Sequence, residues 1–178
     1  VSKDDHLNEK TGTRGSNCTS VDTFILARHR ENDSVWLIPI EWKYTESYEN
    51  QDKSNEDRDN EPKGSNGKGM ERLRRYSGLI DASAQLLSLD SYAGSVYYQE
   101  PFYQLMRQTL WAENVVKHKA TEILEADDYL HIHVIPEDNR DLLDKRYKVS
   151  GKGMEETWRD MLIDQSKYVI ISPKALMA

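Results

Sequence analysis

Two apolar stretches near the start of the chain have the composition of β-strands. The first is VDTFILARH (residues 21–29) and the second is VWLIPIEWKY (residues 35–44), and both are rich in β-branched, aromatic and aliphatic residues. Between them, ENDS (residues 31–34) is a cluster of turn-forming residues. The pattern therefore predicts a β-hairpin over this part of the chain.

Farther along, the apolar residues recur with the period of a helix. From residue 69, Met70, Leu73 and Ile80 lie on one stripe, and residues 100–118 form the clearest helix, with Pro101 in its first turn. The remaining expected elements are strands at 129–136 and 167–173 and short helices at 138–146 and 154–164. This order predicts an α/β fold in which the long helix crosses between strands that could run parallel.

Residues 46–69 differ in kind, because they show no apolar period and are dominated by polar residues. Residues 46–62 carry seven acidic and two basic side chains, a balance of −5, and residues 63–75 carry five basic and one acidic, a balance of +4. We expect a single domain over residues 1–178 with a flexible insert at about 46–69. A local basic patch therefore follows the acidic part of the insert, although the net charge of the chain is negative.

The composition excludes several classes of protein. The chain has 178 residues, a formal net charge of −7 and one cysteine, Cys18, so a disulfide framework and a Cys-rich zinc module are excluded. Residues 35–40 form the longest apolar run, which is too short to cross a bilayer, and residues 1–15 lack the apolar centre of a signal peptide. We expect a cytoplasmic protein with no membrane segment.

The second strand carries Glu41 and Lys43 two residues apart, so both side chains leave the same face. We expect Ile38, Ile40 and Trp42, on the opposite face, to pack against the core. One interpretation is a solvated outer face, because Glu-x-Lys triplets arise often by chance.

Asp22 on the first strand favours a second interpretation. If residues 31–34 form a four-residue hairpin loop, Asp22 lies directly opposite Lys43, on the face that carries Glu41. A loop with an odd number of residues would place Asp22 on the other face. The even loop predicts that two carboxylates and an ammonium meet on a small patch of the sheet.

Such a cluster is suited to phosphate chemistry. Asp22 and Glu41 would supply the hard oxygen ligands that Mg²⁺ prefers, and the backbone carbonyl of Trp42 would add another. The metal polarises a phosphoryl oxygen and lowers the pKa of its bound water. Lys43 would hold the attacking water and offset charge on the phosphate oxygens.

These residues resemble the PD-(D/E)XK nuclease superfamily, which has the restriction-endonuclease-like fold. The resemblance lies in CTSVD (18–22) and IEWKY (40–44), with eighteen residues between the aspartate and the glutamate, and spans about residues 16–136. It implies a mixed central sheet flanked by helices, with residues 21–29, 35–44, 100–118 and 129–135 as the second strand, third strand, second core helix and fourth strand. Two departures are Val21 in place of the proline that often precedes the aspartate, and a first core helix that would lie in or before residues 1–15.

The resemblance also implies an activity, namely Mg²⁺-dependent cleavage of DNA phosphodiester bonds, with Mn²⁺ as a substitute metal. Asp22 and Glu41 would be the metal ligands and Lys43 the catalytic lysine. A symmetric cut of a duplex would require a homodimer. The alternative is a catalytically inactive nuclease-fold module that binds nucleic acid or a protein partner.

Other polar residues are candidates for contacts with DNA or the active site. Gln104 corresponds to a glutamine that faces the active site in several branches of the superfamily, and Arg107 lies on the same helix. Arg72 and Arg75 belong to the basic stretch 68–75, which could grip phosphates. For each, the alternative interpretation is an ordinary solvated helix face.

His131 and His133 share a face of the expected strand 129–136. This spacing can bind zinc, but no further His or Cys lies nearby in the sequence to complete a site. We therefore expect two surface histidines.

Overall fold

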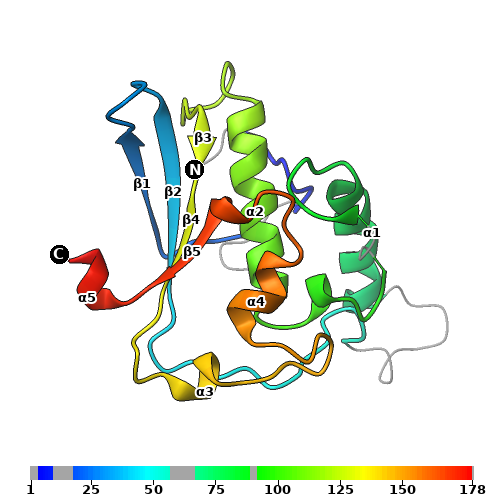
Figure 1. Ribbon diagram of the computed structural model, residues 1–178. Helices are drawn as coiled ribbons and strands as arrows, with labels where there is room; N and C mark the ends of the chain where they lie inside the picture. Colours follow the sequence, from blue (N-terminus) through cyan, green and yellow to red (C-terminus); the bar gives the residue numbers. More distant parts are fainter. Residues whose placement is uncertain (1–3, 10–17, 57–66, 89–91, 178) are drawn as a thin grey trace.

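The computed structural model describes residues 4–9, 18–56, 67–88 and 92–177. Its centre is a five-stranded mixed sheet (Figure 1). The strands are β1 (Thr23–Arg28), β2 (Val35–Trp42), β3 (Asp128–Tyr129), β4 (His131–Val134) and β5 (Tyr168–Ile171). The order across the sheet is β1-β2-β4-β5, and β3 also pairs with β2. β1 runs antiparallel to β2, whereas β3 and β4 run parallel to β2, and β5 runs parallel to β4.

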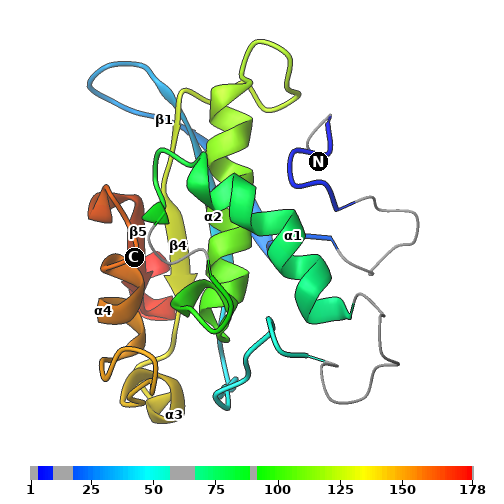
Figure 2. The same ribbon diagram turned by 90° about the vertical axis from the view of Figure 1, so that its right-hand side faces the viewer.

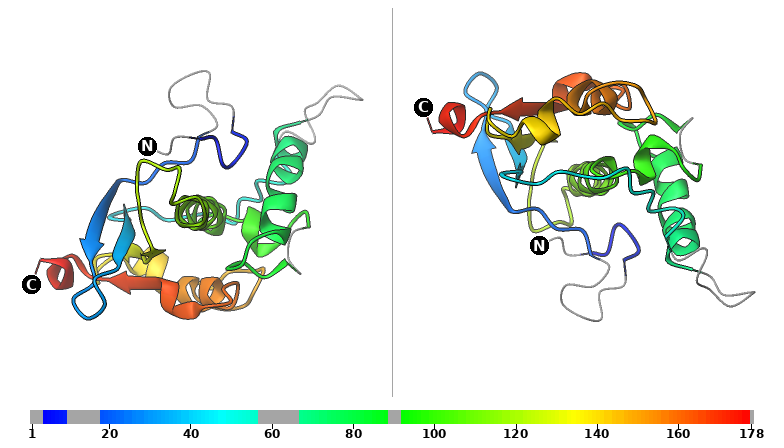
Figure 3. Two further views of the ribbon diagram at one scale, coloured as in Figure 1. Left: turned by 90° about the horizontal axis from the view of Figure 1, so that it is seen from above. Right: turned by 90° about the horizontal axis from the view of Figure 1, so that it is seen from below.

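Helices lie on the sheet in layers. α2 (Phe102–Lys117) runs along one face, and α1 (Lys68–Asp81) lies on the side of α2 away from the sheet (Figures 2 and 3). Three shorter helices follow, namely α3 (Arg140–Leu143), α4 (Met154–Arg159) and α5 (Pro173–Leu176). The expected α/β fold, a mixed central sheet flanked by helices, is therefore confirmed. None of the helices in the described part of the chain is long and apolar enough to cross a membrane.

The four core elements expected from the resemblance are present with small changes in their bounds. The expected strand over 129–136 divides into β3 and β4, because Leu130 leaves the ladder between them while its N–H donates to the carbonyl of Leu37 at 3.0 Å. Residues 4–9 form turns and no helix, and residues 10–15 lie outside the described part of the chain. The expectation of a first core helix is therefore not met by residues 4–9.

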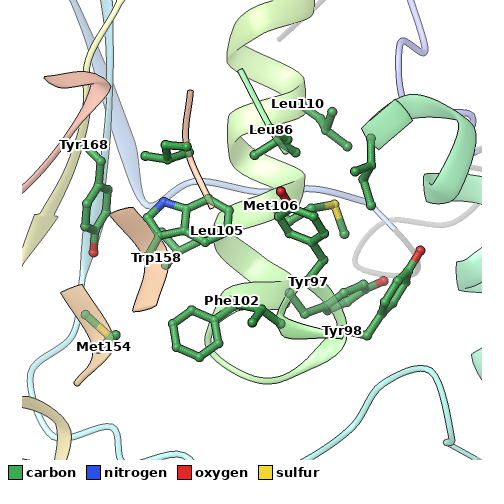
Figure 4. Packing of buried hydrophobic residues seen from close by; sticks show 14 of the residues in the cluster. Leu86, Tyr97, Tyr98, Phe102, Leu105, Met106, Leu110, Met154, Trp158 and Tyr168 are labelled. Carbon is green, nitrogen blue, oxygen red and sulfur yellow. The ribbon is translucent and has the colours of Figure 1, made fainter. Parts of the chain in front are cut away.

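The main core lies between α2 and its neighbours. Phe102, Leu105, Met106 and Leu110 form the buried face of α2, at the helical spacing that the sequence predicts. They pack with buried side chains from α1, the 3-10 helix η2 (Val96–Tyr98) and α4 (Figure 4). A second cluster joins α2 to the sheet, where Leu37 contacts the helix near Ala112 and Val115. α2 thus connects the core to the sheet.

The face of β2 that α2 covers is the one we expected to be exposed or functional. Glu41 and Lys43 lie on this face with Leu37, and both are only 4% exposed. Of the three side chains expected to pack against the core, Ile40 is buried at 2% exposure. The expectation is wrong for Ile38 and Trp42, because both are half-buried and neither belongs to the two apolar clusters. The reason is that helix packing, which strand alternation does not determine, decides which face is inside.

The hairpin register differs from the expected one, because the loop lies one residue earlier in the chain than predicted. Thr23 pairs with Ile40, and the N–H of His29 donates to the carbonyl of Ser34 at 2.8 Å, so the loop comprises residues 30–33. Asp33 has a positive φ of 64°, which closes the turn one residue earlier than expected. The loop still has four residues, so each side chain keeps its face of the sheet.

Part of the expected insert packs on the helical layer. The N–H of Lys53 donates to the carbonyl of Tyr98 at 2.7 Å, and Ser54 is buried. Gly69, at the start of α1, lies so close to Ser54 that an added Cβ would come within 2.1 Å of its carbonyl oxygen. Residues 57–66 of the expected insert lie outside the described part of the chain.

Candidate active site

Glu41 and Lys43 form a buried ion pair between β2 and α2. The Lys43 Nζ donates to the Glu41 Oε1 at 2.7 Å, and each side chain is 5% exposed. The solvated outer face considered for this triplet is therefore excluded. Removing two charges from water is costly, so the pair requires further polar partners in its surroundings.

Two glutamines on α2 supply these partners. The Gln104 Nε2 donates to the Glu41 Oε1 at 2.6 Å, and the Gln104 Oε1 accepts from the Lys43 Nζ at 2.9 Å. One turn later, the Gln108 Nε2 donates to the Glu41 Oε2 at 2.8 Å. Because residues four apart share a helix face, both amides reach the same carboxylate. Gln104 was predicted from the family resemblance, whereas Gln108, four residues later on the same helix, was not among the predicted site residues.

The electrostatic surroundings keep Lys43 charged. Burial alone would lower the pKa of Lys43, but the hydrogen bond and the charge of Glu41 outweigh it, and the pKa of the ammonium is raised above its ordinary value. The Nζ also lies 5.9 Å from the ring centre of Tyr48. The backbone of Lys43 is held as well, since the Asn139 Nδ2 donates to its carbonyl oxygen at 3.1 Å. Sequence patterns gave no signal for Tyr48 or Asn139.

Asp22 lies directly before β1 and is exposed. Its Oδ2 accepts from the backbone N–H of Trp42 at 2.8 Å, between the two residues of the buried pair. The expected pairing of Asp22 with Lys43 is wrong, because the observed register, continued by one residue, pairs Asp22 with Glu41. This continuation keeps Asp22 on the face that carries Glu41.

The segment that leads to Asp22 is tied to α2. The Gln108 Nε2 donates to the Ser20 carbonyl oxygen at 2.9 Å. Glu9, 5% exposed, accepts from the Tyr76 hydroxyl at 2.8 Å and the Arg107 Nη2 at 3.2 Å, and it also accepts from the backbone N–H of Thr19. Glu9 is a residue that the sequence did not indicate, since it stands in a polar stretch without a pattern.

The expected basic residues line a cavity beside this site. Arg107 bonds to Glu9, Arg72 donates to the Glu56 Oε2 at 2.6 Å, and Arg75 pairs with Glu71. The cavity has a volume of 440 Å³ and is lined by Cys18, Lys68, Glu71, Arg72, Arg75, Tyr76, Tyr103 and Arg107. A smaller one of 150 Å³ lies against the two glutamines and shares Tyr103 and Arg107 with it. The structure thus brings Gln104, Arg107, Arg72 and Arg75 to one side of α2.

His131 and His133 are buried, at 1% and 0% exposure, so the expectation of surface histidines is wrong. β4 is a central strand between β2 and β5, and the pairing of His133 with Glu41 places the histidines on the face of the sheet that carries Glu41. The His133 Nδ1 lies 3.2 Å from the Tyr168 hydroxyl. Burial, with a smaller contribution from the charge of Lys43, lowers the pKa of His131 to about 3, so the ring is neutral at pH 7.

The oxygen atoms near Glu41 are chemically suited to a hard cation. Asp22 and Glu41 offer carboxylates, Trp42 and Ser20 offer backbone carbonyls, and the buried Oε1 of Gln108 has no hydrogen-bond partner. Among the described residues, no group of three or more His, Cys, Asp or Glu side chains is placed to hold a metal ion. Any cation here would therefore rely on two carboxylates with neutral oxygens.

Comparison with known proteins identifies a family but no individual relative. No curated protein and no solved structure matches the chain. Residues 3–178 match the family described as Restriction Endonuclease associating with ARP. The match covers the sheet, α2 and every residue of the site above, and the chain belongs to this restriction-endonuclease family.

Proposed function

We propose that this protein is a Mg²⁺-dependent DNA endonuclease of the PD-(D/E)XK type. The observation that supports it most strongly is the ion pair of Glu41 and Lys43, buried under α2 and bonded to Gln104 and Gln108. A buried ion pair is often no more stabilising than apolar side chains of the same size. A chemical role accounts for it better than a structural one.

The residues around Glu41 fit a magnesium ion. Asp22, Glu41 and the carbonyl of Trp42 would hold it, because all three are oxygen donors on or beside β2. When bound, the metal polarises the phosphoryl oxygen and makes hydroxide available near neutral pH. Mn²⁺ would substitute, since it accepts the same ligands.

Lys43 would act as a cation, because its ammonium donates hydrogen bonds to Glu41 and Gln104. In that state Lys43 can orient the attacking water and offset charge that grows on the phosphate oxygens. Gln104 holds the ammonium in place through its amide oxygen.

DNA would pass over the basic cavity beside the site. Lys68, Arg72, Arg75 and Arg107 line it, and guanidinium groups can form charge-assisted bonds with phosphates. Their present carboxylate partners would have to share or release them. Because one site cuts one strand, a double-strand cut requires two copies of the chain, and we propose a homodimer for that reaction.

A second candidate is an inactive nuclease-fold module that binds nucleic acid or a protein partner. The observation that favours it is that both carboxylate oxygens of Glu41 already accept hydrogen bonds from side chains of the protein.

The two candidates are separated by incubating supercoiled plasmid with the full chain, with Mg²⁺ and with EDTA. The endonuclease should nick plasmid only with Mg²⁺, and Lys43→Met and Asp22→Asn should abolish nicking. Lys117→Met removes an exposed lysine at the far end of α2 and should nick as the unaltered protein does. Absence of nicking by the unaltered protein, or equal nicking by Lys43→Met, would favour the binding module.

A further inference from the structure

Gln104 and Gln108 contact the same carboxylate but differ in how their amides are used. Both ends of Gln104 are satisfied, since its nitrogen donates to Glu41 and its oxygen accepts from Lys43. The nitrogen of Gln108 donates twice, to the Glu41 Oε2 at 2.8 Å and to the Ser20 carbonyl oxygen at 2.9 Å. Its Oε1 has no hydrogen-bond partner, and it cannot be reached by water because the residue is only 1% exposed.

The orientation of the Gln108 amide follows from its two neighbours. A carboxylate oxygen and a backbone carbonyl oxygen are both acceptors, so the amide must present its nitrogen to them. The Nε2 therefore occupies a point at which a negative oxygen and a carbonyl oxygen converge. A cation would be attracted to the same point, for the same electrostatic reason.

We propose that Gln108 is a ligand of the divalent cation, through its Oε1. This proposal rests on the proposed function and adds a residue to its metal site. In the metal-free protein the amide nitrogen substitutes for the cation between Glu41 and Ser20. With Mg²⁺ or Mn²⁺ bound, the Gln108 Oε1 would be a ligand together with the Glu41 Oε2 and the Ser20 carbonyl oxygen.

This role accounts for two features of the site together. A buried unpaired acceptor is costly and calls for an explanation, and a bound cation would satisfy the Gln108 Oε1. The ligand set would also draw on three parts of the chain: β2, the middle of α2, and the segment 20–22 that carries Asp22. The neutral amide and carbonyl ligands would compensate for a site with only two carboxylates.

The test measures Mn²⁺ binding to the full chain without DNA, by electron paramagnetic resonance, for the unaltered protein, Gln108→Leu and Gln108→Glu. Loss even of an outer-shell partner typically weakens metal binding about 10–100-fold, so Gln108→Leu should weaken it by roughly tenfold or more. Gln108→Glu should bind as tightly as the unaltered protein or more tightly, because a carboxylate is also an oxygen ligand.

Gln108→Glu separates the proposed role from its simplest competitor. If Gln108 serves only to donate a hydrogen bond to Glu41, a glutamate cannot replace it, and both variants would bind Mn²⁺ equally poorly. That result, or equal affinity in all three proteins, would overturn the role of Gln108 while leaving the proposed function intact. Failure of the unaltered protein to bind Mn²⁺ would instead overturn the proposed function itself.

Two further measurements protect the test against variants that fold poorly. Mn²⁺ should raise the melting temperature of Gln108→Glu more than that of the unaltered protein. Without the metal, the added carboxylate repels Glu41, and a bound cation between the two carboxylates would remove this repulsion. In the unaltered protein, Mg²⁺ should shift the nuclear magnetic resonance signals of the Gln108 side-chain amide. An amide signal that stays unchanged when Mg²⁺ is bound would contradict the proposal.

Discussion

At the scale of single residues, the buried pair of Glu41 and Lys43 dominates the energetics of the site. Each charge has lost its water, and its replacement is a set of bonds from the partner, Gln104 and Gln108. Such a network is stable only when every member is present. If one member is truncated, the others stay buried without a partner, and the free energy lost on removing them from water is no longer offset.

A double-mutant cycle measures this dependence. Lys43→Met should lower the free energy of unfolding by about 3–5 kcal/mol, because it leaves the Glu41 carboxylate buried without its cation. Adding Glu41→Gln should recover part of that loss, since the remaining group is neutral. Urea unfolding at pH 7 gives both values. Purely additive losses would show that the two charges are not coupled.

The sequence predicted the residues of this network unevenly. Alternation along a strand placed Glu41 and Lys43 on one face, because that period is fixed by backbone geometry, whereas Gln104 was predicted only from the family resemblance. Glu9 could not be identified, because its contacts come from residues far away in the sequence. Which of the candidate functional residues act in catalysis is still a prediction.

At the scale of elements, the two buried histidines of β4 should make the protein less stable in acid. His131 and His133 are neutral inside the protein, with pKa values lowered first by burial, whereas in the unfolded chain they titrate near 6.5. The unfolded state therefore binds more protons below pH 6.5, and acid favours unfolding. Stability should be intact above pH 6.5 and fall as the pH drops toward about 3.

The expected loss is about 2 kcal/mol for each buried histidine between pH 6.5 and pH 5. Urea unfolding at pH 7 and pH 5 measures it, and His131→Phe should reduce the difference. His29→Gln, at an exposed position directly before the hairpin loop, serves as the control and should leave the difference unchanged. Equal pH dependence in His131→Phe and the unaltered protein would contradict the burial argument.

Helix α1 contains two glycines, Gly69 near its start and Gly78 near its end, that can be compared. Gly69→Ala should destabilise the protein by about 1–3 kcal/mol, because the new methyl group would lie 2.1 Å from the Ser54 carbonyl oxygen. Gly78→Ala, in the same helix with nothing within 4 Å of the new atom, should stabilise it by about 0.5–1 kcal/mol. Thermal unfolding of both variants checks this, and equal shifts in one direction would show that the contact with Ser54 is not tight.

The elements themselves were largely predictable, but their register and their faces were not. Apolar periodicity placed the start of α1 and both ends of α2 within two residues of the observed positions, because long amphipathic segments give a strong signal. The hairpin loop moved by one residue, since Asp33 adopts a left-handed conformation that composition alone does not specify. Alternation along β2 gave two faces but could not say that α2 covers the one with Glu41.

At the scale of the whole molecule, the net charge is −7, but cationic side chains are concentrated in one place on the protein. Four cationic side chains border one cavity between α1 and α2, next to the site under the glutamines. If this side receives DNA, affinity should fall linearly on a double-logarithmic plot against salt concentration, because phosphate contacts release counterions.

Binding to a short duplex, measured with Ca²⁺ to prevent cleavage, tests this surface. Arg75→Gln and Arg72→Gln should each reduce the slope of the salt dependence by about 1, because each removes one cation that pairs with a phosphate. Lys117→Gln, at the far end of α2, should leave the slope unchanged. The same slope in all four proteins would place the DNA on another face.

In the proposed function, Asp22, Glu41 and Lys43 gather around one divalent cation on the face of the sheet that α2 covers. The most direct measurement is anomalous diffraction from a crystal of the full chain soaked in Mn²⁺. We predict a single strong peak within coordination distance of the Asp22 and Glu41 carboxylates, with the Lys43 ammonium beside it. A peak elsewhere, or no peak with Glu41 still bonded to Lys43, Gln104 and Gln108, would contradict the claim.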